Sequence, residues 1–216
     1  MLVGKNIYKN YGEVSVLKDV DIEIAESEVV SIVGASGAGK STLLQILGTL
    51  EKPDSGIVTL FDSDYTTLNN NDLSKLRNEK IGFVFQFHNL MAELTAIENI
   101  CLPAWIGGED KTESKTNAEN LLDLMGLSHR KSHYPSEMSG GEQQRVAVAR
   151  ALINKPSYVL ADEPSGNLDT KNADELHQLF FDVRKQLGCS FVIVTHNAKF
   201  ADLADRKLVI EDGRFV

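Results

Sequence analysis

The stretch GASGAGKST, at residues 34–42, decides the fold that this sequence predicts. It matches the pattern GxxxxGK[ST], in which glycines let backbone N–H groups surround a phosphate and the lysine reaches the terminal phosphates. The strand-like run EVVSIV precedes it at residues 28–33. Leucines follow it at helical spacing: Leu43, Leu44, Leu47 and Leu50. A phosphate loop needs this strand-to-helix setting, so the whole stretch is predicted to bind a nucleotide: Gly34, Ala35, Ser36, Gly37, Ala38, Gly39, Lys40, Ser41 and Thr42.

Apolar runs elsewhere in the chain alternate with helical patterns. KIGFVFQ (80–86), SYVLAD (157–162) and SFVIVTH (190–196) are apolar on both faces, as are parallel strands that helices cover. A helix is predicted from Thr170 to Gly188, where glycine is a normal C-terminal cap. Its expected core stripe is Ala173, Leu176, Phe180, Val183 and Leu187. These patterns predict an α/β fold with a parallel sheet.

The remaining segments predict two additions to that core. Residues 1–27, GIVTLFD (56–62) and the closing KLVIEDGRFV (207–216) alternate in polarity, which favours an antiparallel β lobe. A mostly helical insertion is expected at about residues 87–155. No low-complexity linker divides the chain, so residues 1–216 are predicted to form a single domain.

The charge balance limits the partners. The chain has 22 basic and 31 acidic residues, and this net charge of −9 argues against nucleic acid as a partner. Its apolar runs are shorter than the roughly 20 residues of a membrane-spanning helix. Cys101 and Cys189 lie in apolar runs, as expected of unpaired thiols in a reducing compartment. No export signal is visible, so we expect the protein in the cytoplasm.

Two adjacent carboxylates follow the strand at 157–162. Asp162 and Glu163 would reach the carboxyl edge of the sheet, where α/β proteins bind ligands. Successive side chains of an extended chain point apart, so Asp162 can face Mg²⁺ together with the Ser41 hydroxyl. Glu163 can then face a water in line with the γ-phosphate of a nucleoside triphosphate. Such a pair alone is usually a solvated turn, but the phosphate loop favours the functional interpretation.

The motif SGGEQQR at residues 139–145 resembles the signature motif of ATP-binding cassette (ABC) transporter proteins. Gln86 stands where that family has its Q-loop, residues 165–169 (SGNLD) resemble its D-loop, and His196 stands at its switch histidine. The resemblance covers essentially the whole chain. It implies a RecA-like P-loop NTPase core with an antiparallel β lobe and an inserted helical lobe. It also implies ATP and Mg²⁺ as ligands and ATP hydrolysis as the activity.

The same resemblance implies roles for individual residues. Tyr11 would stack on adenine, Gln86 would assist catalysis and hold the metal with Ser41 and Asp162, and His196 would act beside Glu163. The signature residues would bind the ATP held by a second, head-to-tail copy of the chain: Ser139, Gly140, Gly141 and Glu142. Asp169 of the D-loop would also contact ATP. Ser139 and Glu142 also form a capping-box pattern, so a helix start is the simpler interpretation.

Within the family, the strings at residues 82–91 and 94–103 resemble the ATPases of lipoprotein-releasing systems. Macrolide-exporter and cell-division cassettes are the alternatives, and a soluble non-transport ABC protein or a P-loop kinase is less favoured. The resemblance implies a peripheral protein on the cytoplasmic face of the inner membrane. Integral membrane subunits would dock near residues 87–100, from Phe87 to Ile100, a segment whose apolar side chains could equally be core. Phe87, Leu90, Met91 and Leu94 are the contacts expected there.

Overall fold

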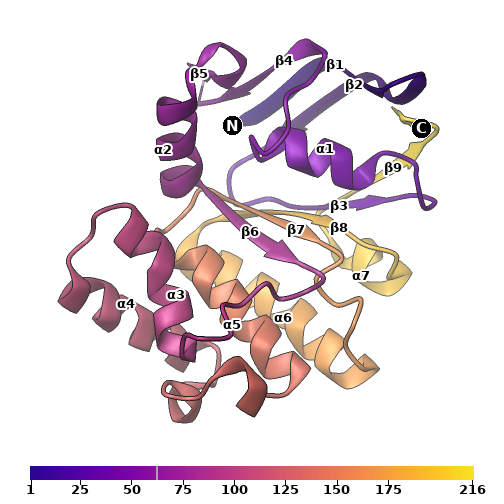
Figure 1. The fold of residues 1–216 in the computed structure, drawn as a ribbon. Helices are drawn as coiled ribbons and strands as arrows, with labels where there is room; N and C mark the ends of the chain where they lie inside the picture. The colour runs from indigo at the N-terminus through magenta and orange to yellow at the C-terminus, as the bar shows by residue number, and fades with distance from the viewer. Residues whose placement is uncertain (62) are drawn as a thin grey trace.

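The computed structural model describes residues 1–61 and 63–216. Asp62, the last residue of the predicted strand 56–62, lies outside the described residues. Within this part of the chain the strands form a six-stranded and a four-stranded sheet. Figure 1 shows α1 between the two sheets and α5 and α6 on the opposite side of the larger one. The protein is therefore layered around the larger sheet.

The larger sheet has the strand order β10-β9-β3-β8-β7-β6. Its strands are β3 (Val29–Val33), β6 (Ile81–Phe85), β7 (Tyr158–Asp162), β8 (Ser190–Val194), β9 (Arg206–Glu211) and β10 (Arg214–Phe215). All neighbouring pairs are parallel except β9 with β10. The four strands predicted from apolar runs are β3, β6, β7 and β8, so the predicted α/β fold with a parallel sheet is confirmed.

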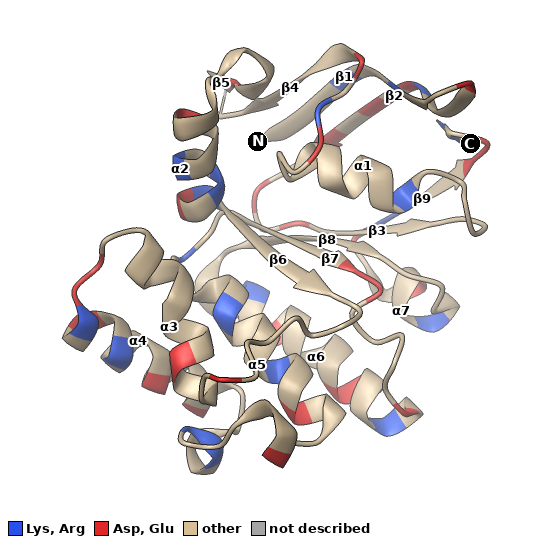
Figure 2. Cartoon of the chain, in the orientation of Figure 1, with Lys and Arg blue, Asp and Glu red and all other residues tan. Residues whose placement is uncertain are grey.

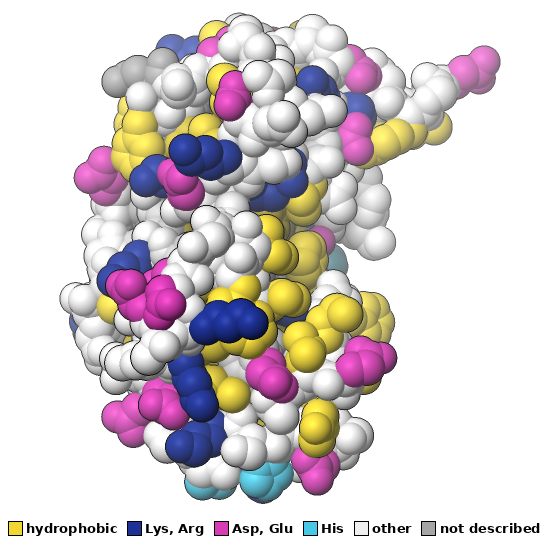
Figure 3. Space-filling model, turned by 60° about the vertical axis from the view of Figure 1, so that its left-hand side comes forward, with side chains coloured by type: hydrophobic (Ala, Val, Ile, Leu, Met, Phe, Trp, Pro, Cys, Tyr) yellow, Lys and Arg dark blue, Asp and Glu magenta, His cyan; other side chains and the backbone are white. Residues whose placement is uncertain are grey.

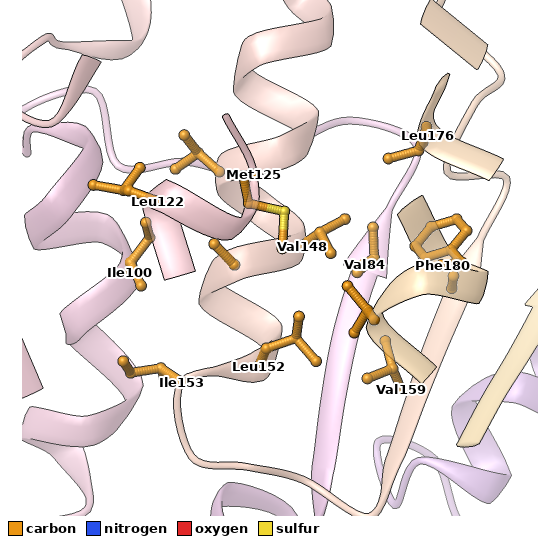
Figure 4. Packing of buried hydrophobic residues seen from close by; sticks show 14 of the residues in the cluster. Val84, Ile100, Leu122, Met125, Val148, Leu152, Ile153, Val159, Leu176 and Phe180 are labelled. Carbon is orange, nitrogen blue, oxygen red and sulfur yellow. The ribbon is translucent and has the colours of Figure 1, made fainter. Parts of the chain in front are cut away.

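Successive residues of β7 enter different cores on the two faces of this sheet. Tyr158 and Leu160 belong to the upper core, which the smaller sheet and α1 share. Val159 and Ala161 belong to the lower core, which includes side chains of α3, α4, α5 and α6. Figure 4 shows Val159 in the lower core among apolar residues of neighbouring elements. Burial on both faces explains why the strand is a continuous apolar run.

The smaller sheet is antiparallel, as the first 27 residues predict. Its order is β2-β1-β4-β5, and the strands are β1 (Leu2–Tyr11), β2 (Val14–Ile24), β4 (Ser55–Leu60) and β5 (Ser63–Asp64). The prediction that residues 207–216 join this lobe is wrong. β9 pairs in parallel with β3, from Val30 opposite Arg206 to Val33 opposite Val209, and only its hairpin with β10 is antiparallel. Alternating polarity marks a half-exposed strand but does not identify the sheet that it joins.

The helices lie between strands along the chain. They are α1 (Lys40–Leu47), α2 (Asn70–Lys80), α3 (Ala96–Ile106), α4 (Lys111–Leu124), α5 (Gly140–Leu152), α6 (Thr170–Leu187) and α7 (Ala198–Leu203), with 3-10 turns η1 (Tyr65–Thr67), η2 (Ser128–Arg130) and η3 (Pro135–Glu137). Leu187, which was predicted to lie in the core stripe of α6, is instead 47% exposed in the last turn of that helix. α1 ends at Leu47, and Leu50 beyond it is 45% exposed. Helical spacing shows which face of a helix is buried, but it does not show where the elements that cover this face end.

The helices α3, α4 and α5 occupy the region predicted to be a helical insertion, residues 87–155, whose boundaries stay a prediction. Figure 2 shows Lys and Arg interspersed with Asp and Glu on α2, α4, α5 and α6. Among the described residues, no helix is both long and apolar enough to span a bilayer. Cys101 and Cys189 are buried and unpaired.

Candidate active site

The motif at residues 34–42 forms the loop that follows β3 and the first residues of α1, as predicted. Its backbone needs glycine, because Gly37 and Gly39 have φ angles of +80° and +102°. A Cβ atom on Gly39 would also lie 2.8 Å from the carbonyl oxygen of Val16. This close approach brings the loop against β2 and directs the N-terminal N–H groups of α1 into it. Such a helix start attracts anions.

Lys40, the first residue of α1, is only 6% exposed. Its ammonium group donates hydrogen bonds to the carbonyl oxygens of Gly34 at 3.0 Å and Ala35 at 2.8 Å. The positive charge is thus held inside the loop, beside the positive end of the helix dipole. Phosphate oxygens are the ligands that this combination of ammonium and N–H groups suits best.

Ser41 and Asp162 meet across the gap between α1 and β7. The Ser41 hydroxyl donates to Asp162 Oδ1 over 3.1 Å. A hydroxyl and a carboxylate fit Mg²⁺, which prefers oxygen ligands and uses few protein groups together with substrate phosphates. Among the described residues, no cluster of three or more His, Cys, Asp and Glu side chains forms a self-sufficient metal site. The donor set therefore suits a metal that arrives with a nucleotide.

Glu163 has a left-handed backbone conformation, with a φ angle of +47°. This is unfavourable for a residue with a Cβ atom and persists only where the surroundings hold it. One carboxylate oxygen accepts a hydrogen bond from the His196 N–H at 3.2 Å, and the other lies 3.3 Å from His196 Nε2. Burial raises the pKa of Glu163, and the His196 N–H partly offsets the rise. The carboxylate is therefore more basic than an exposed glutamate.

A cavity of about 360 Å³ brings many of the predicted residues together. It is lined by Tyr11, Val16, Ser36, Gly37, Gly39, Lys40, Ser41, Thr42, Glu163, Val194 and His196. The ring of Tyr11 is 47% exposed, and the Lys9 ammonium lies 5.4 Å from its centroid. The cavity thus joins a phosphate loop, a basic carboxylate and an exposed aromatic ring.

Several predicted site residues do not line this cavity: Gly34, Ala35, Ala38, Gln86, Ser139, Gly140, Gly141, Glu142, Asp162 and Asp169. Gln86 is held elsewhere, because its amide donates to Asn167 Oδ1 at 3.2 Å and its carbonyl oxygen accepts from Asn167 Nδ2 at 3.1 Å. Asp169 caps α6 by accepting from the Asn172 N–H at 2.9 Å. Within one chain, these residues lie outside the phosphate cavity.

The residues from Ser139 to Glu142 begin α5 with the expected capping box. The Ser139 hydroxyl accepts from the Glu142 N–H at 3.3 Å, and Glu142 accepts from the Ser139 N–H at 2.8 Å. Gly141 is required by close packing, because a Cβ atom there would lie 2.6 Å from the Asn172 side-chain oxygen. Arg130 donates to Glu142 over 2.8 Å. The motif therefore has a structural role in its own chain.

The sequence-based site omits three residues that the structure adds. Val16 lines the cavity from β2, Val194 lines it from β8, and Asn167 binds Gln86. Val16 had no signal beyond the alternation of its strand. Asn167 lies inside the D-loop motif, so its position was marked although its partner was not.

The family comparison agrees with this geometry. The ABC transporter family matches residues 17–166. The lipoprotein-releasing system ATP-binding protein LolD of Cytophaga hutchinsonii is 60% identical over 213 residues, covering 99% of this chain and 97% of the relative. The LolD protein of Bacteroides fragilis is 53% identical over the whole of both chains.

Solved structures lead to the same family. The dimeric structure of MJ0796, a bacterial ABC transporter cassette, has a TM-score of 0.91 at 40% identity, covering 100% of this chain and 96% of that one. MJ0796 in a dimeric post-hydrolysis state bound to ADP and Pi has a TM-score of 0.90 at 39% identity, with the same coverage. The protein therefore belongs to the ABC transporter family, as an ATP-binding subunit with ATPase activity.

Proposed function

We propose that this protein is the ATPase of a lipoprotein-releasing transporter, and that it drives release of lipoproteins from the inner membrane. The observation that carries the proposal is the cavity in which the phosphate loop faces Glu163 and His196. The full-length similarity to proteins named LolD supports the choice of transporter. The chain would act as a peripheral subunit on the cytoplasmic face of that membrane.

In this proposal the loop holds the triphosphate of ATP. Its N–H groups and the Lys40 ammonium bind the β and γ phosphates, and Tyr11 stacks on the adenine ring. Ser41 and Asp162 would hold Mg²⁺, with Gln86 as a further ligand, and the bound ion would neutralise phosphate charge during transfer. To act there, the Gln86 side chain would have to release its hydrogen bond to Asn167 Oδ1, whereas the bond from Asn167 Nδ2 to the Gln86 backbone carbonyl could remain.

Glu163 orients and deprotonates the attacking water in this scheme. Its raised pKa brings its basicity closer to neutral pH, which favours general-base catalysis. His196 holds the carboxylate through its backbone N–H, and its ring lies beside the carboxylate at the edge of the cavity, where it would contact the γ-phosphate. The pair therefore places a base and a hydrogen-bonding group on the same side of the cavity.

The site is completed by a second copy of the chain. Ser139, Gly140, Gly141, Glu142 and Asp169 lie outside the cavity of their own chain, which supports a role toward the nucleotide of a head-to-tail partner. The capped start of α5 presents N–H groups, and these suit a γ-phosphate. ATP would then join the two subunits.

The catalytic proposal is tested by replacing Glu163. Glu163→Gln keeps the size and hydrogen-bonding capacity of the side chain but removes the base, so we expect hydrolysis to fall at least about 100-fold with ATP affinity retained. The measurement is phosphate release, paired with binding of a fluorescent ATP analogue. Glu119→Gln, on the exposed face of α4, is the control and should hydrolyse ATP normally. Turnover by Glu163→Gln near the wild-type rate would contradict the assigned role.

We further propose that the membrane subunits dock beside Gln86. A groove of about 400 Å³ is lined by residues of α2, β6, α3 and α5, including Phe83, Phe85 and Ile106. Figure 3 shows apolar side chains together with Lys and Arg on the side of the molecule that carries α2 and α3. In the segment 87–100, Phe87 is 70% and Met91 49% exposed. These two side chains extend the apolar surface available to a partner.

The other predicted contact residues of the segment 87–100 differ in how accessible they are to a partner. Leu90 packs against the lower core and Ile100 is fully buried, so for these two the core interpretation holds. Leu94 is half-buried. Arg150 of α5 donates to the carbonyl oxygens of His88 at 2.9 Å and Asn89 at 2.6 Å. Movement of a docked partner can therefore reach α5, whose first residues are the signature motif.

Docking is tested with a charge at an exposed position. Phe87→Glu and Met91→Lys should weaken co-purification with the lipoprotein-releasing membrane subunits about tenfold or more, because the charge would be buried unpaired. ATP binding and thermal unfolding should not change. Leu203→Lys, 65% exposed on α7, is the matched control. Full co-purification of the folded variants would exclude this surface, and pairing with a macrolide-exporter or cell-division membrane protein would exclude lipoprotein release.

A further inference from the structure

His177 is a buried polar side chain on the core-facing side of α6. It is 5% exposed, whereas its buried neighbours on that face are apolar: Ala173, Leu176, Phe180 and Val183. An apolar side chain could fill this space without losing hydration, so a buried imidazole needs a specific partner.

That partner is the loop that follows Glu163. His177 Nε2 lies 3.0 Å from the hydroxyl of Ser165, which is itself buried. Burial lowers the pKa of His177, opposed by the charge of Asp174, and this favours the neutral ring. Nε2 of the neutral ring and the Ser165 hydroxyl form one hydrogen bond, in which one group donates and the other accepts. This bond fixes the side chain of Ser165 in the lower core.

Ser165 belongs to the turn that carries Glu163. The carbonyl oxygen of Glu163 accepts a hydrogen bond from the Gly166 N–H at 3.0 Å, so Ser165 lies inside this closed turn. The turn begins at the left-handed backbone of Glu163. Because a strained residue relaxes unless its neighbours are held, the Ser165 anchor restrains the direction of the Glu163 side chain.

The face of the imidazole ring contacts the segment that follows His196. The ring stacks on Phe200 of α7, with centroids 4.2 Å apart and planes 24° apart. The Phe200 N–H donates to Asn197 Oδ1 at 3.1 Å, and Asn197 directly follows His196. His177 therefore contacts both chain segments that leave the Glu163–His196 pair.

We propose that His177 is a positioning residue that holds Glu163 in place for hydrolysis through its hydrogen bond to Ser165, while its stack on Phe200 packs the ring against the segment that follows His196. The inference rests on the proposed function of Glu163 and His196. His177 lies outside the nucleotide cavity, so it acts on the geometry of the reaction and not on the binding of ATP. When the general base is displaced by up to about 1 Å, kcat falls and KM stays nearly unchanged.

The test separates the hydrogen bond from the ring stack. His177→Phe retains a ring against Phe200 but cannot bond Ser165, and we expect kcat about tenfold lower, with unchanged KM for ATP and no loss of thermal stability. His177→Gln retains a hydrogen-bonding group near the position of Nε2 but loses the stack, and it should keep kcat within about threefold of wild type. A purely structural histidine would give the opposite order, with the apolar ring tolerated and the buried amide harmful.

Ser165→Ala removes the same hydrogen bond from the loop side with little change in volume. We expect about the same tenfold fall in kcat, and no further fall when it is combined with His177→Phe, because the two changes remove one interaction. The measurement is steady-state phosphate release by the full chain, with circular dichroism to verify folding. Wild-type kcat in folded His177→Phe and Ser165→Ala would overturn the inference alone. A wild-type chain that does not hydrolyse ATP would overturn the proposed function as well.

Discussion

At the scale of single residues, the site depends on how Glu163 is held. Its backbone is left-handed, and both its carboxylate oxygens face His196. Burial of the side chain makes ionisation less favourable and raises its pKa. The same burial that makes the carboxylate a better base therefore lowers the stability of the fold at neutral pH.

This cost predicts a pH-dependent stabilisation by Glu163→Gln. The folded pKa lies above the unfolded value of about 4.3, so between these two values the folded chain binds more protons than the unfolded one. The free energy of unfolding therefore falls as pH rises through this window. We expect the variant to melt about 2–4 °C higher than wild type near pH 7.5, with the difference vanishing near pH 4. Circular dichroism without nucleotide measures it, and a difference independent of pH would contradict it.

At the scale of elements, the first turn of α5 serves two purposes. Ser139 and Glu142 cap the helix reciprocally, while Gly141 allows α6 to approach through Asn172. The same N–H groups are proposed to bind a partner's nucleotide. The Glu142 carboxylate also forms an ion pair with Arg130.

Glu142→Gln should make the chain less sensitive to acid. Burial raises the pKa of Glu142, but the Ser139 N–H and the Arg130 guanidinium outweigh burial and leave the pKa lowered. A lowered folded pKa stabilises the protein above the unfolded pKa, about 4.3, and this contribution is lost as pH falls through the folded value.

We expect Glu142→Gln to unfold about 1 kcal/mol more easily in urea at pH 7, and to lose less stability than wild type below pH 4. Glu119→Gln, whose carboxylate lies 3.5 Å from Lys131 at an exposed position, is the control and should change little. Parallel pH profiles for wild type and Glu142→Gln would show that the Arg130 pair does not contribute.

At the scale of the whole molecule, the proposed machinery is divided between two surfaces. The phosphate cavity lies above the carboxyl ends of the central strands, and the start of α5 lies outside it. The related cassette MJ0796, solved as a dimer, shares the fold over the full length of this chain. In the proposed arrangement, two copies placed head to tail would bring each α5 start to the other copy's cavity.

Blocking hydrolysis should therefore trap a dimer. With saturating ATP and Mg²⁺, Glu163→Gln should elute at twice the monomer mass with two nucleotides, whereas free wild type should be mostly monomeric. Light scattering coupled to size exclusion measures the mass. Lys40→Ala combined with Glu163→Gln should stay monomeric, because the lysine that is proposed to bind the terminal phosphates is lost. A Glu163→Gln chain that stays monomeric under these conditions would count against a shared site.

Local sequence patterns determined most of the fold. Strands that are buried on both faces must be apolar throughout, so β3, β6, β7 and β8 were visible as apolar runs. The phosphate loop needs glycine at positive φ, and the caps of α5 and α6 need particular side chains, so these features also appear as short motifs. Each depends on neighbours within a few residues, which a sequence displays directly.

Tertiary structure alone decided what depends on residues distant in the chain. Alternating polarity did not reveal that β9 pairs with β3, because register and partner are set by packing of the whole sheet. Helical spacing could not show that Leu187 lies beyond the elements that cover the buried face of α6. The contact of His177 with Ser165 and Phe200 requires α6 and α7 to be already packed. These features depend on contacts between elements that are distant in the sequence. The free energy that stabilises them therefore cannot be assigned to a single segment.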